Sequence, residues 1–247
     1  MMIIDSHVHI GREVKIYKNF YLADYLKFMK DNHIGKSVIM PVPISVEKIN
    51  FLNENLVNSV LSLSEKVKKN LAIVGLIGSG GVRINEILNH IRGFKYHPSI
   101  SQIPINNNEL YRFFLLVEKN FPIIVHCGRD SISHITHLID IASKFEHVNF
   151  VAAHLGGQAS DLIYESINLF KKATLKNIYA DTSGCYDPQL IRMAVDVLGD
   201  DRILFGSDEP YLNMNMGLYC LKLAKLSRTS MKKVLSENAE RLFFKRS

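Results

Sequence analysis

The chain opens with the segment IDSHVH, residues 4–9, in which apolar and β-branched positions lead into two histidines. This pattern is typical of a β-strand that ends in His7 and His9. Side chains two positions apart on a strand point to the same face, so the two imidazoles could share one ion. Asp5 lies on that face, and we expect it to orient a histidine through a hydrogen bond. The alternative is a pair of surface histidines near a terminus.

Similar apolar, β-branched runs recur along the rest of the chain. Nearly continuous apolar runs are typical of parallel strands that are covered on both faces. We expect eight strands, at residues 2–8, 37–42, 71–77, 93–96, 123–126, 148–154, 178–182 and 203–207.

Amphipathic segments separate these runs. Their apolar residues recur at helical spacing, which is typical of helices that pack one face against a sheet. We expect helices at residues 22–32, 109–120, 131–145, 160–172, 188–198 and 230–244.

Alternating strands and helices could form either an open doubly wound sheet or a closed barrel. The polar residues favour the barrel, because they follow the carboxyl ends of the first strand and of strands four to eight. In a barrel those ends meet at one mouth, where active sites are built. The length of 247 residues fits a single domain of this kind. We therefore predict an α/β fold, a (β/α)8 TIM barrel that spans residues 1–247 as one domain.

Composition and charge restrict the function only weakly. The net charge is +6 and the sequence pI is about 9.1, but the lysines are spread along the chain as on solvated helix faces. An anionic substrate stays open, and a nucleic-acid partner is not expected. The three cysteines match no zinc-finger or disulfide spacing. We see neither a signal peptide nor a membrane span, and we expect a cytoplasmic protein with reduced thiols.

Two further histidines follow apolar strands. His126 ends the run PIIVH, and His154 ends the run FVAAH. Each could be a hydrogen-bonded residue at the edge of the core. Glycines follow both, so the backbone can turn sharply there and leave room for a ligand. Residues 78–81, GSGG, could form an anion-binding nest, although a simple loop is the preferred interpretation.

A carboxylate follows the last strand. Asp208 ends the run ILFGSD, where a charge is costly unless it is paired or bound to a metal. A helix N-cap is the alternative. His7, His9, His126, His154 and Asp208 together form a set of nitrogen and oxygen donors that suits zinc, and also iron, manganese or nickel.

Other polar residues near the expected mouth are candidates for substrate binding. Lys95 and His97 end the fourth strand. Arg12 lies shortly after His9 in the sequence, and Arg129 lies shortly after His126. Arginine binds carboxylates in a bidentate way, so either arginine could hold an acidic substrate. Structural or surface roles are the alternative for all four.

Six stretches of the sequence resemble, in order, the signatures of the amidohydrolase-related family, whose members include relatives of aminocarboxymuconate-semialdehyde decarboxylase. These stretches are IDSHVH (4–9), GFKYHP (93–98), HCG (126–128), HLGG (154–157), FGSD (205–208) and ENAERLF (237–243). The resemblance implies a divalent metal, with zinc preferred, on His7, His9, His126 and Asp208. It also implies that His154 lies beside the metal and acts on water or substrate. In some amidohydrolases the lysine that matches Lys95 is carbamylated, but here we expect a free amine.

The preferred function is metal-dependent hydrolysis of a small ester, lactone or amide. Asp208 would take a proton from the attacking water, and His154 would orient that water or stabilise an oxyanion. Nonoxidative decarboxylation on the same site is the alternative, because the family contains both classes.

Two more distant readings remain. A TatD-type deoxyribonuclease would share the first histidine pair, but the fourth strand carries Lys95 where that family places a glutamate ligand. A barrel without catalytic activity would leave buried polar residues without compensation. The sequence leaves the oligomeric state open, and a homodimer is compatible with it.

Overall fold

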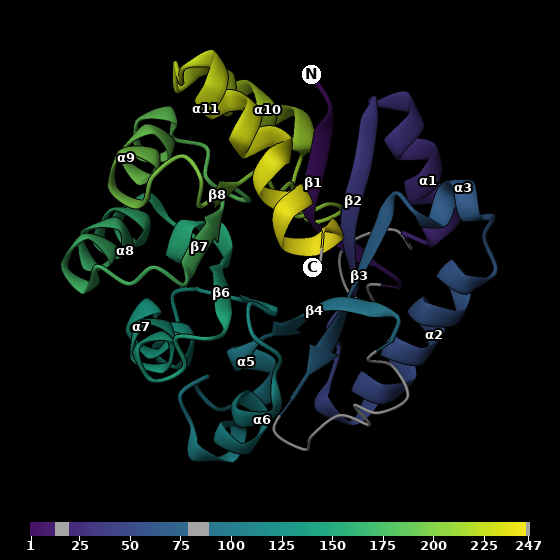
Figure 1. Cartoon of the computed structure of the whole chain (residues 1–247), viewed down its shortest axis with the longest axis horizontal. Coiled ribbons are helices and arrows are strands. Elements are labelled where there is room, and N and C mark those ends of the chain that lie inside the picture. Colours follow the sequence, from purple (N-terminus) through teal and green to yellow (C-terminus); the bar gives the residue numbers. More distant parts are fainter. Residues whose placement is uncertain (13–19, 79–88, 246–247) are drawn as a thin grey trace.

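The computed structural model describes residues 1–12, 20–78 and 89–245, and its strands form the barrel that the sequence predicts (Figure 1). Eight parallel strands pair in chain order from β1 to β8, and helices surround them. The strands are β1 (Ile3–Ile10), β2 (Ile34–Pro41), β3 (Leu71–Ile77), β4 (Ile91–Tyr96), β5 (Pro122–Val125), β6 (Asn149–Ala152), β7 (Ile178–Asp181) and β8 (Ile203–Leu204).

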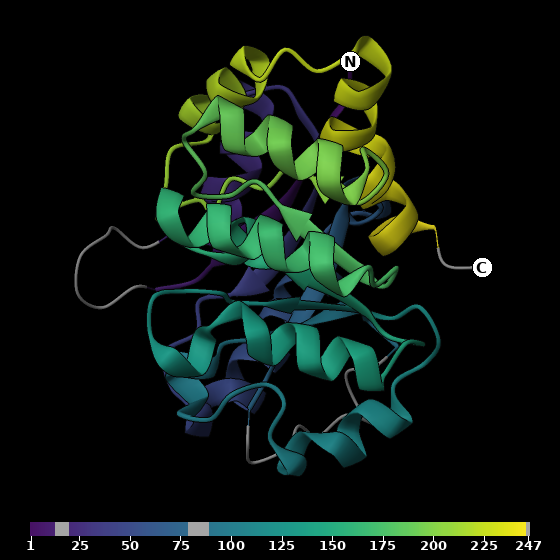
Figure 2. The ribbon, with the colours of Figure 1, turned by 90° about the vertical axis from the view of Figure 1, so that its left-hand side faces the viewer.

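The helices lie outside the ring of strands (Figure 2). They are α1 (Leu22–Asp31), α2 (Ile49–Leu61), α3 (Glu65–Lys68), α5 (Pro98–Ser101), α6 (Tyr111–Leu116), α7 (Ile135–Lys144), α8 (Ser160–Ala173), α9 (Pro188–Leu198), α10 (Met214–Leu223) and α11 (Arg228–Lys232). Short 3-10 turns add η1 (Val46–Lys48), η2 (Asn108–Leu110), η3 (Ser131–Ser133) and η4 (Ala153–Gly156), and π-helical turns add η5 (Lys233–Glu237) and η6 (Glu240–Phe244).

Most of the expected elements are present, with shifted ends. β4 is longer than the expected run, and β8 is shorter, since it ends at Leu204. The expected helix at 131–145 starts as a 3-10 turn and becomes α-helical at Ile135. The pattern did not predict α2 and α10. Residues 79–81 of the glycine-rich stretch lie outside the described residues, as do residues 13–19.

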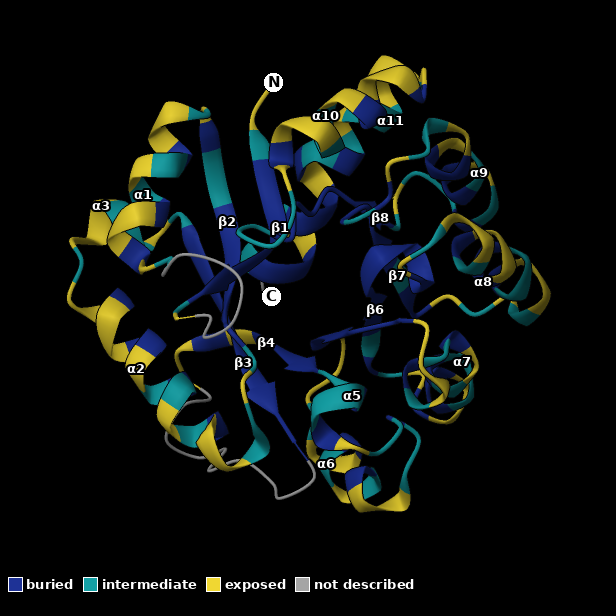
Figure 3. Ribbon diagram, turned by 180° about the vertical axis from the view of Figure 1, so that it is seen from behind, coloured by how far each residue is buried: buried dark blue, intermediate teal, exposed yellow. Residues whose placement is uncertain are grey.

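The strands are buried on both faces, whereas the helices expose their outer sides (Figure 3). A large apolar cluster lies between strands and helices. A second cluster fills the inside of the barrel, where Ile4, Val38, Val74, Ile124 and Val151 meet. This arrangement explains why the strands read as continuous apolar runs rather than as alternating ones.

The C-terminal helical segment closes one end of this inner cluster. Helical turns continue from Arg228 to Phe244, and Ala239, Leu242 and Phe243 pack into the interior cluster. Asn238 donates to the carbonyls of Asp200 and Ile203 at 2.8 and 2.7 Å, which ties the segment to the start of β8. The barrel therefore has a closed floor, and its other end is left for a site.

None of the helices in the described ranges has the length and apolar character that a bilayer crossing requires. All three cysteines, Cys127, Cys185 and Cys220, are buried and unbridged.

Replacing Phe243 with alanine should lower the free energy of unfolding by about 3–5 kcal/mol. The ring is fully buried in the barrel floor, so its removal leaves a cavity among residues that cannot collapse freely. Phe244→Ala is the matched control, because Phe244 is only partly buried at the edge of the same cluster. Urea unfolding measures both variants, and equal losses would contradict the assignment of Phe243 to the floor.

Candidate metal centre

The carboxyl ends of the strands surround a cavity of about 380 Å³. Six of the residues singled out from the sequence line it: His9, Lys95, His97, His126, His154 and Asp208. Pro43, Ile100, Gln158, Tyr211 and Leu212 complete the wall. The cavity is large enough for a small molecule.

Backbone hydrogen bonds join β1 to residues 205–209, which follow β8, at this mouth of the barrel. The amide of Asp208 donates to the carbonyl of His7 at 2.8 Å, and the amide of His9 donates to the carbonyl of Glu209 at 2.8 Å. A Cβ atom on Gly206 would lie 2.9 Å from the Cβ of His7, so glycine is needed for this close approach. The pairing places Asp208 directly beside the two histidines.

His7, His9 and Asp208 form a compact group of metal-binding atoms, all within 4.8 Å of one another. Oδ1 of Asp208 lies 3.5 Å from Nε2 of His7 and 3.2 Å from Nε2 of His9. The two Nε2 atoms are 3.2 Å apart. All three residues are buried. The structure therefore brings three of the four predicted ligands together without any rearrangement.

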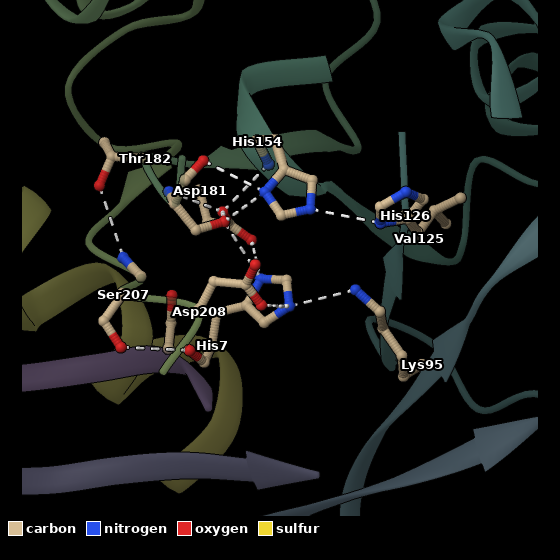
Figure 4. A network of polar contacts seen from close by, with 12 residues as sticks. His7, Lys95, Val125, His126, His154, Asp181, Thr182, Ser207 and Asp208 are labelled. Carbon is tan, nitrogen blue, oxygen red and sulfur yellow. Dashed lines mark hydrogen bonds and ion pairs between the residues drawn. The ribbon is translucent and has the colours of Figure 1, made fainter. Parts of the chain in front are cut away.

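A hydrogen bond on the far side of the His7 ring determines which of its nitrogens carries a proton. Nδ1 of His7 lies 2.9 Å from Oδ2 of Asp181, and Nδ1 of His9 lies 3.3 Å from the carbonyl oxygen of Pro41. A carboxylate oxygen only accepts, so His7 carries its proton on Nδ1. His9 has an acceptor oxygen beside each ring nitrogen, the carbonyl of Pro41 at Nδ1 and Oδ1 of Asp208 at Nε2. The Nε2 lone pair of His7 then faces Nε2 of His9 and Oδ1 of Asp208. Figure 4 shows His7 and Asp208 side by side.

The electrostatics of the group agree with this assignment. Burial and the nearby Lys95 lower the pKa of His7 to about 4, so the ring is neutral at pH 7. Burial by itself would raise the pKa of Asp208, but the hydrogen bond with His9 and the facing imidazoles hold it below its usual range. Neutral imidazoles and an ionised carboxylate are the forms that bind metal ions.

Lys95 reaches into the same group from β4. Its side chain is buried, and Nζ lies 3.2 Å from Nε2 of His7 (Figure 4). Burial lowers its pKa. The amine therefore borders both the donor group and the cavity.

His126 and His154 form a second pair in the cavity wall. Nε2 of His154 lies 3.3 Å from Nδ1 of His126, and the ring of His154 stacks on that of His7 at 5.4 Å. Burial lowers the pKa of both imidazoles. The nitrogens of His126 lie outside the compact group of three, so His126 borders the group as the structure stands.

The backbone is unusual at the two residues for which the sequence suggested catalytic roles. His154 lies on the turn η4 with φ 59° and ψ 36°, and Asp208 has φ 63°. Left-handed backbone costs about 1–2 kcal/mol for residues other than glycine. The turn at His154 ends β6 two residues earlier than the expected strand, and it directs the imidazole into the mouth.

Asp181 and Ser183 support the donor group. The carboxylate of Asp181 binds His7 through Oδ2, and its Oδ1 accepts from the backbone amides of His154 and Ser183. Burial alone would raise the pKa of Asp181, but the facing His7 holds it below its usual range. In the sequence, the carboxylate of Asp181 at the end of the seventh apolar run is compatible with a supporting role in the site or with a hydrogen bond to a helix, and nothing indicates Ser183.

Asp5 differs from the expectation that it would orient an imidazole. Its Oδ1 accepts from the backbone amides of His7 and Ser207, at 3.2 and 2.9 Å. Burial raises its pKa to about 7. Asp5 therefore links β1 to the loop that carries Asp208, through the backbone.

The remaining substrate candidates divide into two groups. His97 lines the cavity, and its ring stacks on His126 with the centroids 3.9 Å apart. Burial, followed by the charge of Lys95, lowers its pKa to about 3, and its Nδ1 is buried without a partner among the described residues. Arg12 and Arg129 are exposed and do not line the cavity, and Arg129 lies 3.7 Å from Asp161 on the surface.

A family model described as amidohydrolase matches residues 4–245. The chain belongs to the amidohydrolase family. Members of this family are metal-dependent enzymes, so this amidohydrolase is one as well. No curated protein sequence matches the chain.

Solved structures with the same fold cover nearly the whole of this amidohydrolase. The 5-carboxyvanillate decarboxylase of Sphingomonas paucimobilis is 13% identical with a TM-score of 0.75, and 98% of each chain is covered. A Pseudomonas putida protein proposed to be a 2-pyrone-4,6-dicarboxylic acid hydrolase is 14% identical with a TM-score of 0.71, covering 100% of this chain and 99% of that one. An amidohydrolase of Burkholderia multivorans with bound zinc is 17% identical with a TM-score of 0.71, covering 98% and 99%.

The donor set fits the divalent metal that the family implies. Nε2 of His7, Nε2 of His9 and Oδ1 of Asp208 are ligand atoms that zinc and similar ions bind, and they lie within 3.5 Å of one another in a buried position. A divalent cation among His7, His9 and Asp208 would satisfy all three groups at once.

The buried histidines should make the metal-free protein sensitive to acid. A histidine with a depressed folded pKa is protonated first in the unfolded chain, so stability falls as pH drops below about 6.5. In His97→Gln this loss should be smaller than in the wild type, by about 1.5 kcal/mol between pH 6.5 and pH 5. Urea unfolding in the presence of a chelator measures it. His90→Gln, which changes an exposed histidine, is the control, and an unchanged pH slope in His97→Gln would contradict the burial effect.

Proposed function

We propose that this amidohydrolase uses a divalent metal, with zinc preferred, to hydrolyse a small ester, lactone or amide. One observation carries the proposal: the Nε2 atoms of His7 and His9 and a carboxylate oxygen of Asp208 converge beside a cavity of about 380 Å³. His126 in the adjacent wall is the fourth proposed ligand. Zinc is preferred because the set is rich in imidazole, and the similar Burkholderia multivorans structure contains zinc.

The proposed chemistry divides between the ion and the chain. A divalent ion supplies a Lewis acid that polarises a substrate oxygen and makes a water molecule easier to deprotonate. Asp208 is the proposed proton acceptor, since the surrounding histidines keep its carboxylate ionised inside the cavity wall. It would then pass the proton to the leaving group. His154, across the cavity, is the proposed partner of the attacking water.

The lining also supports a preference for an acidic substrate. Among the described residues that line the cavity, Lys95 is the one lysine or arginine, and it lies beside the donor group. His97, directly after β4, presents an imidazole to the same cavity. We therefore propose Lys95 and His97 as substrate-binding residues. The positions of Arg12 and Arg129 do not support a role in substrate binding, because both side chains are exposed outside the cavity.

Nonoxidative decarboxylation is the second candidate. Lys95 could hold a carboxylate group close to the donor group, and a decarboxylase is among the similar structures. In that reaction His154 or a water would have to deliver a proton to carbon before carbon dioxide leaves. The two candidates differ in their products, because hydrolysis consumes water and releases acid, whereas decarboxylation releases carbon dioxide.

Asp208→Asn should lower turnover by about 100- to 10,000-fold, because it removes the proposed proton acceptor while keeping the shape of the side chain. The assay uses metal-loaded protein against a panel of small lactones, esters, amides and aromatic carboxylic acids. A pH indicator detects the acid that hydrolysis releases, and a coupled assay detects carbon dioxide.

Asp196→Asn is the matched control, since Asp196 is an exposed carboxylate that pairs with Arg192 on α9. Full activity in Asp208→Asn would refute the role of Asp208. Release of carbon dioxide without release of acid would refute hydrolysis and assign decarboxylation as the activity. Cleavage of DNA by the metal-loaded wild type, with no turnover of the panel, would instead favour the TatD-type nuclease.

A further inference from the structure

Ser183 lies between a carboxylate and the imidazole of His154, directly after β7. Its side chain is buried, and its Oγ lies 2.9 Å from Nδ1 of His154. The hydroxyl also donates a short hydrogen bond to Oδ1 of Asp181. The carbonyl oxygen of Ser183 lies 3.2 Å from the same Nδ1. Asp181, Ser183 and His154 thus form a chain of three hydrogen-bonded groups.

The direction of each bond in this chain follows from its members. A carboxylate only accepts, so the single hydroxyl hydrogen of Ser183 is used on Asp181. The Oγ atom can then only accept from His154, and the carbonyl of Ser183 can also only accept. Both contacts require a proton on Nδ1 of His154.

The other nitrogen of the ring is therefore the one that faces the reaction space. His154 lines the cavity, and its Nε2 lies 3.3 Å from Nδ1 of His126 in the same wall. In the neutral ring a proton on Nδ1 leaves a lone pair on Nε2. Such a nitrogen accepts a hydrogen bond from a water but cannot donate one to an oxyanion or a proton to carbon.

We propose that Ser183, held by Asp181, is a positioning residue that fixes His154 as a hydrogen-bond acceptor toward the cavity. As an acceptor, His154 would orient the attacking water, and that role rests on the proposed hydrolase function. The position of the proton itself does not. The arrangement disfavours a resting proton donor at His154, so decarboxylation would have to take its proton from a water.

The position of the proton can be read without any substrate. Zinc-loaded protein with ¹⁵N-labelled histidine gives long-range ¹H–¹⁵N correlations for each ring, and His154→Gln identifies the signals of His154 by their loss. We expect a protonated, pyrrole-type Nδ1 and an unprotonated, pyridine-type Nε2 in the wild type. The opposite pattern, with the proton on Nε2, would overturn the proposal.

Removal of the hydroxyl tests Ser183 itself. In Ser183→Ala the Nδ1 proton keeps only the backbone carbonyl as acceptor, so it should exchange with water about tenfold faster. Ser166→Ala is the matched control, because it removes another buried hydroxyl, which donates to the carbonyl of Gly156 at 2.9 Å. A purely structural role for Ser183 predicts that the two variants show the same exchange as the wild type, and that result would refute the proposal.

The same measurements separate this inference from the proposed function. A wild type with the proton on Nδ1 that turns over nothing on the panel would leave the role of Ser183 standing and count against hydrolysis. An active hydrolase with the proton on Nε2 of His154 would support hydrolysis and refute the role of Ser183. Thermal unfolding of both serine variants shows whether a change in exchange reflects loss of the fold.

Discussion

The pairing of the first strand with the last is the constraint on which both the barrel and its site depend. Hydrogen bonds between β1 and residues 205–209 complete the ring, and they also place the carboxylate of Asp208 against His7 and His9. Gly206 allows the loop after β8 to lie close to His7. Asp5 accepts hydrogen bonds from the amides of His7 on β1 and Ser207 on that loop, so it links the two segments. Closing the barrel therefore also assembles the three groups that could hold a divalent metal.

The sequence predicted parallel strands because all eight are covered on both faces and so are continuous apolar runs. It predicted a barrel because polar residues follow the carboxyl ends of the first and of the later strands. It failed where local preference is weak. α2 contains four asparagines, which favour turns over helix interiors, and α10 contains Gly217. These helices form because their apolar residues pack against the barrel, and a local pattern does not contain that contribution.

The sequence identified the proposed metal-binding side chains more readily than the residues that hold them in place. His7, His9 and Asp208 were identified because polar residues that follow buried strands are conspicuous, and the structure brings them together. Asp181 and Ser183 act through contacts that span up to 176 residues, which no local pattern can show. The left-handed backbone at His154 and Asp208 is likewise set by the surrounding structure. Arg12 and Arg129 lie close to proposed ligands in the sequence, but both are exposed and neither lines the cavity.

The most direct test of the account is the position of the metal in a crystal. Diffraction data collected on both sides of the absorption edge of the bound metal locate it without reference to any substrate. We predict an anomalous peak about 2.0–2.2 Å from Nε2 of His7, Nε2 of His9 and a carboxylate oxygen of Asp208. Metal-soaked crystals with no peak at the mouth of the barrel would contradict the account.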